Sequence, residues 1–163
     1  MPKNVSSEQV SNWISEIENT PAQMAKAVHG LSDEQLDTPY RPDGWTIRQV
    51  VHHVPDSHMN SYIRFKWTLT EDTPTIKAYD EKLWGNLPDS LEGPVELSLQ
   101  LLASLHARWV VVLRNLGEED LEKEFVHPES GQKISLKTMV ALYAWHGKHH
   151  LGHITSLKER MGW

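Results

Sequence analysis

The sequence predicts an all-α fold, a four-helix bundle with one long crossover loop. Four segments carry apolar residues at spacings of three, four and seven, the pattern of helices that each bury one face. No segment shows the sustained alternation expected of a strand, and no internal repeat is present. Residues 72–94 hold three prolines and two glycines between the second and third segments, so we expect the crossover there.

Size, charge and cysteine content restrict the class of protein. The 163 residues suit a single domain over residues 1–163 with one substantial core. The net charge of −6 disfavours nucleic acids and anionic membranes as partners, and the absence of cysteine excludes disulfides and thiolate sites. The start MPKNVSSEQ has no apolar stretch of a signal peptide, and the longest apolar run, Met139–Trp145, is too short to span a membrane. We therefore expect a cytoplasmic protein without a membrane partner.

The first helix is expected to begin after Ser6, because Ser6 and Gln9 have the spacing of a capping box. Its apolar positions continue to Val28 and are broken once, near Pro21. A short helical turn over Ser32–Leu36 follows, and the sequence PYRPDGW then predicts a turn.

The second helix is expected to begin near Thr46, with Asp43 or Thr46 as its N-cap. Pro55 lies inside the pattern and predicts a kink or a change of phase. The apolar face of this segment includes one histidine: Ile47, Val51, Val54, His58, Tyr62, Phe65 and Leu69.

The third helix is expected from about Pro94 to Leu116, with His106 on its inward face. An acidic helical piece over residues 118–124 and a turn over residues 127–131 follow it. Ser135 then caps the fourth helix, whose apolar face carries Leu136, Met139, Tyr143, Ile154, Leu157 and Met161.

Four of the ten histidines lie between residues 146 and 153. On a helical wheel, His146 and His150 fall at the centre of the inward face, His149 lies on its flank and His153 is intermediate. Two imidazoles one turn apart on the same side can bind one cation, so the pair predicts a metal site. The alternatives are two hydrogen-bonded core histidines, or an exposed cluster, which the helix phase argues against.

A third ligand has to come from another helix, and periodicity leaves its identity open. His58 and His106 both face inward, whereas His53 lies about 140° from His58 on a straight helix. The proline between the two histidines makes this extrapolation unreliable.

Three stretches, GWTIRQVVHHVPDSHMNSYIRFK, YDEKLW and WHGKHHLGHI, resemble the YfiT-type branch of the DinB-like superfamily, and the likeness covers nearly the whole chain. The resemblance implies a four-helix bundle that binds one divalent metal ion per chain, zinc first and nickel second. It implies three histidine ligands, one from the second helix and a pair four residues apart on the fourth: His53, His146 and His150. It also implies a homodimer.

Three neutral imidazoles leave a metal its full charge and an open position, as in catalytic sites. Such a metal can lower the pKa of a water to about 7 or convert a thiol to thiolate. The resemblance therefore implies an enzyme for small molecules, either a metal-dependent hydrolase or a transferase for a low-molecular-weight thiol such as bacillithiol. The catalytic residues are not assigned. Groups that could assist the metal ligands are Asp56, Asn60 and Tyr143, with His149 and His153 as acid–base groups.

Other side chains have two interpretations each. Five tryptophans could wall a pocket, or pack in the core or a dimer seam, and four cations could attract an anionic substrate or lie on solvated helix faces. They are Trp45, Trp67, Trp84, Trp109, Trp145, Arg41, Arg48, Arg64 and Lys66.

Two other functions compete with an enzyme. One is a non-catalytic metal-binding or ligand-binding bundle, and the other is a helical interaction module with ordinary core histidines. Nucleic-acid binding is the weakest hypothesis because the charge is wrong and no recognition motif is present. Covalent acyl catalysis has no support, since Gly-x-Ser-x-Gly and cysteine are both absent.

Overall fold

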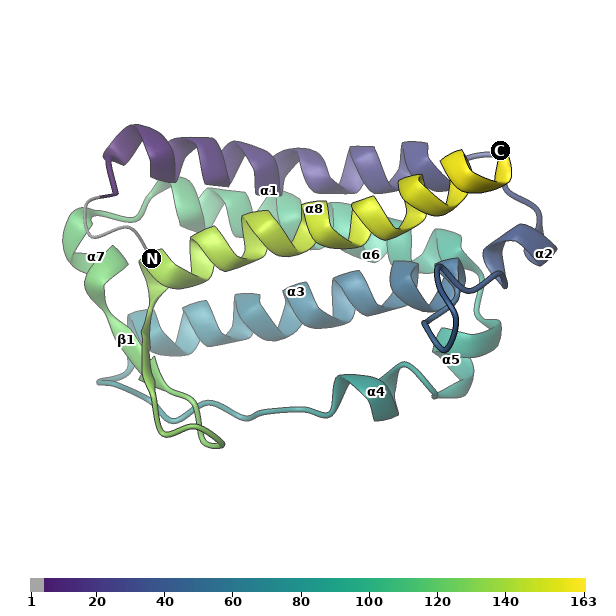
Figure 1. The fold of residues 1–163 in the computed structure, drawn as a ribbon. Coiled ribbons are helices and arrows are strands. Elements are labelled where there is room, and N and C mark those ends of the chain that lie inside the picture. The colour runs from purple at the N-terminus through teal and green to yellow at the C-terminus, as the bar shows by residue number, and fades with distance from the viewer. Residues whose placement is uncertain (1–4) are drawn as a thin grey trace.

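The computed structural model describes residues 5–163 and confirms the four-helix bundle (Figure 1). Its long helices are α1 (Ser7–Val28), α3 (Ile47–Thr70), α6 (Val95–Arg114) and α8 (Leu136–Met161). The first four residues of MPKNVSSEQ, where no signal peptide was expected, lie outside the described residues, as does the start of the predicted domain.

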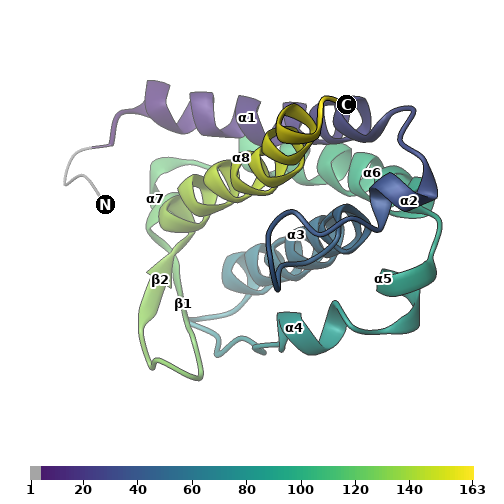
Figure 2. The same ribbon diagram turned by 45° about the vertical axis from the view of Figure 1, so that its right-hand side comes forward.

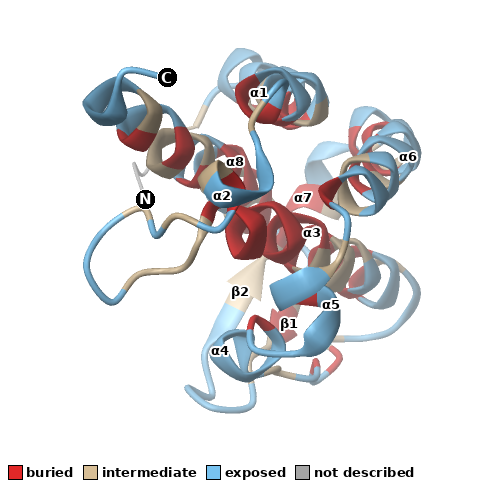
Figure 3. Cartoon of the chain, turned by 90° about the vertical axis from the view of Figure 1, so that its right-hand side faces the viewer, coloured by how far each residue is buried: buried red, intermediate tan, exposed pale blue. Residues whose placement is uncertain are grey.

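The helices are arranged so that α1 and α3 each pack against both α6 and α8. The view along the bundle in Figure 3 shows the buried sides of all four turned inward. Helix α3 is buried on every side over residues 47–55, because the crossover covers the face that the bundle leaves open.

Hydrogen bonds at the helix starts agree with the sequence. The Ser6 hydroxyl accepts from the Gln9 backbone amide, which is one of the two bonds of the predicted capping box, and Ser135 caps α8 in the same way. Thr46 caps α3 and forms both bonds of a capping box with Gln49, which decides between the two predicted caps. Asp43 instead lies in the preceding turn with a φ of 56°.

The helices continue through both internal prolines. Helix α1 continues through Pro21, where the apolar pattern is broken, and α3 runs on through Pro55. A proline removes only one backbone donor from the helix, and packing of the buried face on both sides of it can offset this loss.

The crossover contains two short helices, α4 (Glu81–Trp84) and α5 (Pro88–Glu92), where the sequence predicted a loop. It runs along α3 on the side away from α1 (Figure 2). Side chains of α3 hold it there: the Gln49 amide donates to the Gly85 carbonyl at 2.7 Å, and the Arg48 guanidinium donates to the Gly93 carbonyl at 3.1 Å. The crossover is therefore a fixed wall against α3.

The smaller elements agree in part with the prediction. Helices α2 (Asp33–Leu36) and α7 (Glu118–Glu122) lie where short helical pieces were expected. The strands β1 (Glu124–Val126) and β2 (Lys133–Ser135) form an antiparallel hairpin that the sequence analysis missed. Strands of three residues are too short for an alternating pattern to be recognised.

Helix α6 is long and apolar enough to cross a membrane by length and composition alone, with a mean hydropathy of 1.2 over 18 residues. In the bundle it packs against α1 and α3 and buries His106, Trp109 and Leu113. The core helix of a soluble protein passes the same test, so the hydropathy of α6 is weak evidence for a membrane span.

Candidate metal centre

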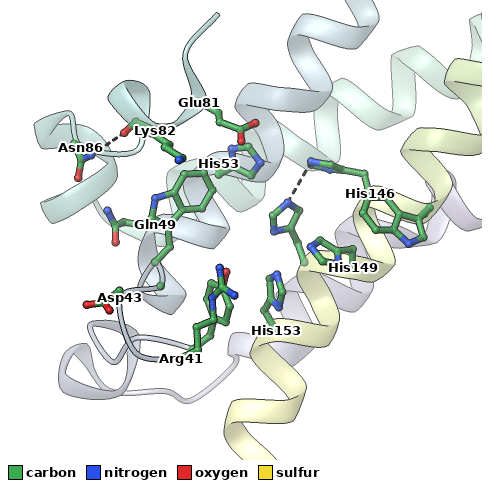
Figure 4. A pocket seen from close by; sticks show the side chains of 15 residues that line it. Arg41, Asp43, Gln49, His53, Glu81, Lys82, Asn86, His146, His149 and His153 are labelled. Atoms are coloured by element: carbon green, nitrogen blue, oxygen red, sulfur yellow. Dashed lines mark hydrogen bonds between the residues drawn. The ribbon is translucent and has the colours of Figure 1, made fainter.

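Three histidine side chains from α3 and α8 converge on one side of a cavity (Figure 4). His53, His146 and His150, called the histidine cluster below, each offer a ring nitrogen within 4.8 Å of the other two. The Nε2 atoms of His146 and His150 lie 3.2 Å apart. Two ligands of a tetrahedral zinc ion at 2.0–2.1 Å are separated by about 3.3 Å, so this pair already has the required spacing.

Local structure explains how each member reaches the cluster. On α8 the four-residue spacing places His146 and His150 on one side, as the helical wheel predicted, and leaves His149 exposed. His53 is only 4% exposed although it lies off the apolar stripe of α3, because this part of α3 is enclosed on all sides. Its ring packs between Trp45 and His150, with centroid distances of 4.6 and 4.7 Å.

Burial keeps the histidine cluster neutral. Desolvation lowers the pKa of His53 to about 4 and, together with the neighbouring His53 and His149, lowers that of His146 to about 3. Burial, together with the neighbouring His146 and His53, also lowers the pKa of His150. A neutral imidazole has one nitrogen with a free lone pair, which is the form that binds a metal.

Unpartnered nitrogen atoms in the histidine cluster fit a metal ion. Nδ1 of His150 is buried without a hydrogen-bond partner, and neither ring nitrogen of His53 bonds to any group within residues 5–163. Buried polar atoms without partners cost free energy, and an ion bound by His53 would give a partner to one of its ring nitrogens, whereas Nδ1 of His150 would stay unpartnered if His150 binds through the Nε2 that faces His146. The donor set, three imidazoles, suits zinc, nickel, copper and cobalt.

His58 and His106, the other inward histidines, lie beside the histidine cluster and bond to each other at 2.8 Å. The second nitrogen of His58 contacts Nδ1 of His146 at 3.1 Å, so both of its ring nitrogens are engaged. The geometry therefore favours His53 over His58 as a third ligand.

The cavity has a volume of ≈ 850 Å³ and opens beside the histidine cluster. The loop before α3, helix α4 and helix α8 form its walls. The His149 ring stacks on Trp145, and the His153 ring stacks on Tyr40 with centroids 4.0 Å apart. Both histidines thus lie beside the cavity, as an acid–base role requires.

The structure shows which of the tryptophans and cations singled out in the sequence lie at the cavity. Of the five tryptophans, Trp45 and Trp145 line the cavity, whereas Trp109 is a core residue. Arg41 extends toward the cavity in Figure 4. The remaining three cations lie elsewhere: Arg48 and Arg64 are buried in other contacts and Lys66 is exposed.

Seven lining residues were not assigned to a site from the sequence: Tyr40, Asp43, Gly44, Gln49, Glu81, Lys82 and Asn86. Three of them belong to the crossover, and only its contacts with α3 bring them to the cavity. A proline-rich and glycine-rich segment carries no periodicity that would place its side chains in space.

The predicted assisting groups do not bond to the cluster. The Asn60 amide donates to the backbone of Asp56, and the Tyr143 hydroxyl donates to the Ser57 carbonyl at 3.2 Å. Burial, reinforced by Asp89, raises the pKa of Asp56 to about 6, but its carboxylate makes no hydrogen bond to a cluster ring within residues 5–163. The neighbours that bond to a cluster ring are His58, 3.1 Å from Nδ1 of His146, and the Ser57 hydroxyl, 3.5 Å from its Nε2.

A family model described as the DinB superfamily matches residues 16–154. A Bacillus cereus protein, strain 03BB102, named "Putative metal-dependent hydrolase" is 57% identical over 159 residues, covering 98% of this chain and 91% of its own. A Bacillus mycoides protein of the same description has the same identity and coverage.

Two solved structures are similar. YfiT from Bacillus subtilis, described as "a probable metal-dependent hydrolase with an unusual four-helix bundle topology", has a TM-score of 0.97 and 50% identity, covering 100% of this chain and 93% of its own. A mycothiol-dependent maleylpyruvate isomerase has a TM-score of 0.62 and 14% identity, covering 89% of this chain and 60% of its own, which is a likeness of fold.

Proposed function

This chain belongs to the DinB superfamily, and from that premise we propose that it is a metal-dependent enzyme acting on a small molecule. We assign His53, His146 and His150 as the ligands of one divalent ion, with zinc expected first and nickel second. The observation that carries the proposal is the convergence of three neutral imidazoles, two buried and one half-buried, on one side of an open cavity.

A bound divalent ion would supply positive charge and an open coordination position, which favour the deprotonated form of a water or a thiol. The protein supplies the remaining functions. His149 and His153 lie beside the cavity, where a ring nitrogen can accept that proton and later return it. Trp45 and Trp145 provide apolar walls for the organic part of a substrate.

Two reactions are compatible with this arrangement: hydrolysis by an activated water, and transfer of a low-molecular-weight thiol to an electrophile. The names of the relatives support the first. The volume of the cavity supports thiol transfer, because ≈ 850 Å³ leaves room for a thiol and an electrophile together. The distant relative with the same fold depends on mycothiol, a small thiol.

The test is turnover by protein purified without a histidine tag, stripped of metal and reloaded with zinc or nickel. One panel offers activated esters and amides, and the other offers small thiols with an aryl halide or an epoxide. We expect turnover in one panel, its loss with chelator and its return with metal, and none in His53→Ala. Binding of the ion without turnover in either panel would instead indicate a non-catalytic metal-binding bundle.

A further inference from the structure

A continuous row of hydrogen bonds links the backbone of α1 to the histidine cluster. Nδ1 of His106 lies 2.6 Å from the carbonyl oxygen of Ile17, and Nε2 of His106 lies 2.8 Å from Nδ1 of His58. Nε2 of His58 lies 3.1 Å from Nδ1 of His146. We call these three residues, His106, His58 and His146, the histidine chain.

The first bond of the histidine chain exists because α1 contains a proline. In an α-helix the Ile17 carbonyl would accept from the amide of the residue four positions later, which is Pro21. Proline has no N–H, so the Ile17 oxygen is left without its helical donor. The buried His106 ring supplies the missing donor from α6.

The direction of every bond in the histidine chain follows from that carbonyl. A carbonyl oxygen only accepts, so Nδ1 of His106 carries the hydrogen. His58 is 0% and His106 is 1% exposed, and burial at this depth favours neutral rings, each with one donor and one acceptor. Nε2 of His106 therefore accepts from Nδ1–H of His58, and Nε2 of His58 accepts from Nδ1–H of His146.

We propose that His58 and His106 are positioning residues that hold His146 in its Nδ1–H tautomer, so that the lone pair of Nε2 points at the other two cluster histidines. The neighbours of His146 Nε2 agree with an acceptor at this atom. His150 Nε2 lies 3.2 Å away and can donate to it, and the Ser57 hydroxyl lies 3.5 Å away, at the outer limit of hydrogen bonding.

The benefit for metal binding rests on the proposed function, whereas the tautomer is a property of the protein without metal. A neutral histidine in solution exchanges between two tautomers, and only one presents the required nitrogen to an ion. When the tautomer and the ring orientation are fixed, no affinity is lost to the tautomer that cannot bind. Residues that hydrogen-bond to a metal ligand in this way are worth about 10–100-fold in metal affinity.

The experiment is NMR of the metal-free protein labelled with ¹⁵N in its histidine rings, which reports the protonated nitrogen of each ring. We expect Nδ1–H at His106, His58 and His146 at neutral pH. Finding His146 with its hydrogen on Nε2 would overturn the proposal. Because no metal is present, this result does not depend on whether the protein is an enzyme.

Three variants test whether the histidine chain acts through His146. In His106→Leu the acceptor for His58 is lost, so we expect mixed tautomers at His146 and a zinc Kd raised about 10–100-fold in chelator competition. His106→Gln keeps a donor and an acceptor in one side chain, and we expect it to restore most of the Nδ1–H tautomer at His146 and most of the zinc affinity.

The matched control is His52→Gln, since His52 is also buried on α3 but bonds to Ser98 and to the Gly93 carbonyl, away from the histidine chain. It should lower the melting temperature and leave the His146 tautomer and the zinc Kd unchanged. An unchanged tautomer and Kd in His106→Leu would refute the positioning role. The expected tautomers in a wild-type protein that binds no zinc would support the histidine chain and refute the proposed metal site.

Discussion

Gly147 of α8 lies against Thr20 of α1 so closely that a β-carbon at Gly147 would stand 2.7 Å from the Thr20 hydroxyl oxygen. Gly147 follows His146 directly, so this contact also sets the depth of the cluster-bearing turn of α8 in the bundle. Glycine is required here by the space between two helices, because Gly147 has no unusual backbone angle.

Gly147→Ala is expected to destabilise the protein by about 1–2 kcal/mol, since overpacking between α1 and α8 outweighs the better helix propensity of alanine. Urea denaturation measures the change. Gly152→Ala on the same helix is the control, because nothing lies within 4 Å of its added β-carbon, and it should stabilise by about 0.5–1 kcal/mol. Adding Thr20→Ala to Gly147→Ala should recover most of the loss; no recovery would contradict the proposed clash.

Arg48 connects the start of α3 to both the segment before it and the crossover. Its guanidinium bonds to Asp33 at 2.8 Å, to Asp37 at 2.6 Å and to the Gly93 carbonyl. We expect Arg48→Met to lower the free energy of unfolding by about 1–3 kcal/mol, because buried hydrogen bonds are lost while the two carboxylates stay in water. Lys66→Met, at an exposed position of α3, is the control and should change the free energy of unfolding by less than about 0.5 kcal/mol.

Stability of the metal-free protein should fall in mild acid. Burial lowers the pKa of His53 and of His106 to about 4, so the unfolded chain takes up protons near pH 6.5 while the folded protein does not. The free energy of unfolding is then highest above pH 6.5 and decreases as the pH falls toward about 4, at up to about 1.4 kcal/mol per pH unit for each histidine. Denaturation at a series of pH values measures this.

Protonation of Asp56 raises the free energy of unfolding as the pH falls through the same range. Burial raises the pKa of this carboxyl to about 6, so its protonation favours the folded state. One carboxyl offsets part of the loss from several buried histidines. A stability that stays constant or rises between pH 6.5 and 4.5 would contradict the neutral, buried state of the rings.

His149 and His153 are expected to act on the substrate without binding the metal. Both line the cavity, and neither belongs to the histidine cluster. His149→Gln and His153→Gln should keep the wild-type metal content, and the variant that loses the acid–base group should lose about 10²-fold or more in kcat. Metal analysis and turnover on the active panel check the two parts. Full turnover in both variants would exclude an acid–base role for these rings.

The sequence predicted the parts of the fold that periodicity describes. Capping residues at Ser6, Thr46 and Ser135 and the apolar stripes located the long helices, and the wheel placed His146 and His150 inside. These features are local, so they can be recognised without knowing which helices are neighbours.

Features that depend on tertiary contacts could not be derived in this way. The inward position of His53 results from Trp45 of the loop before α3 and His150 of α8, which pack against its ring, and only the family resemblance pointed to it. Lys82 reaches the cavity through contacts of the crossover, and His106 finds its acceptor at Ile17 through a proline on another helix. Helix α1 continues across the broken apolar pattern near Pro21 because packing on both sides of the proline retains the helix.

The central claim is that His53, His146 and His150 hold one metal ion, and elemental analysis of tag-free protein tests it most directly. After incubation with zinc or nickel and removal of free ion, we expect about one ion per chain in the wild type and almost none in His53→Ala or His146→Ala. His58→Ala should still take up the ion, with weaker affinity. No bound metal in the wild type would contradict the account, as would loss in His58→Ala together with full retention in His53→Ala.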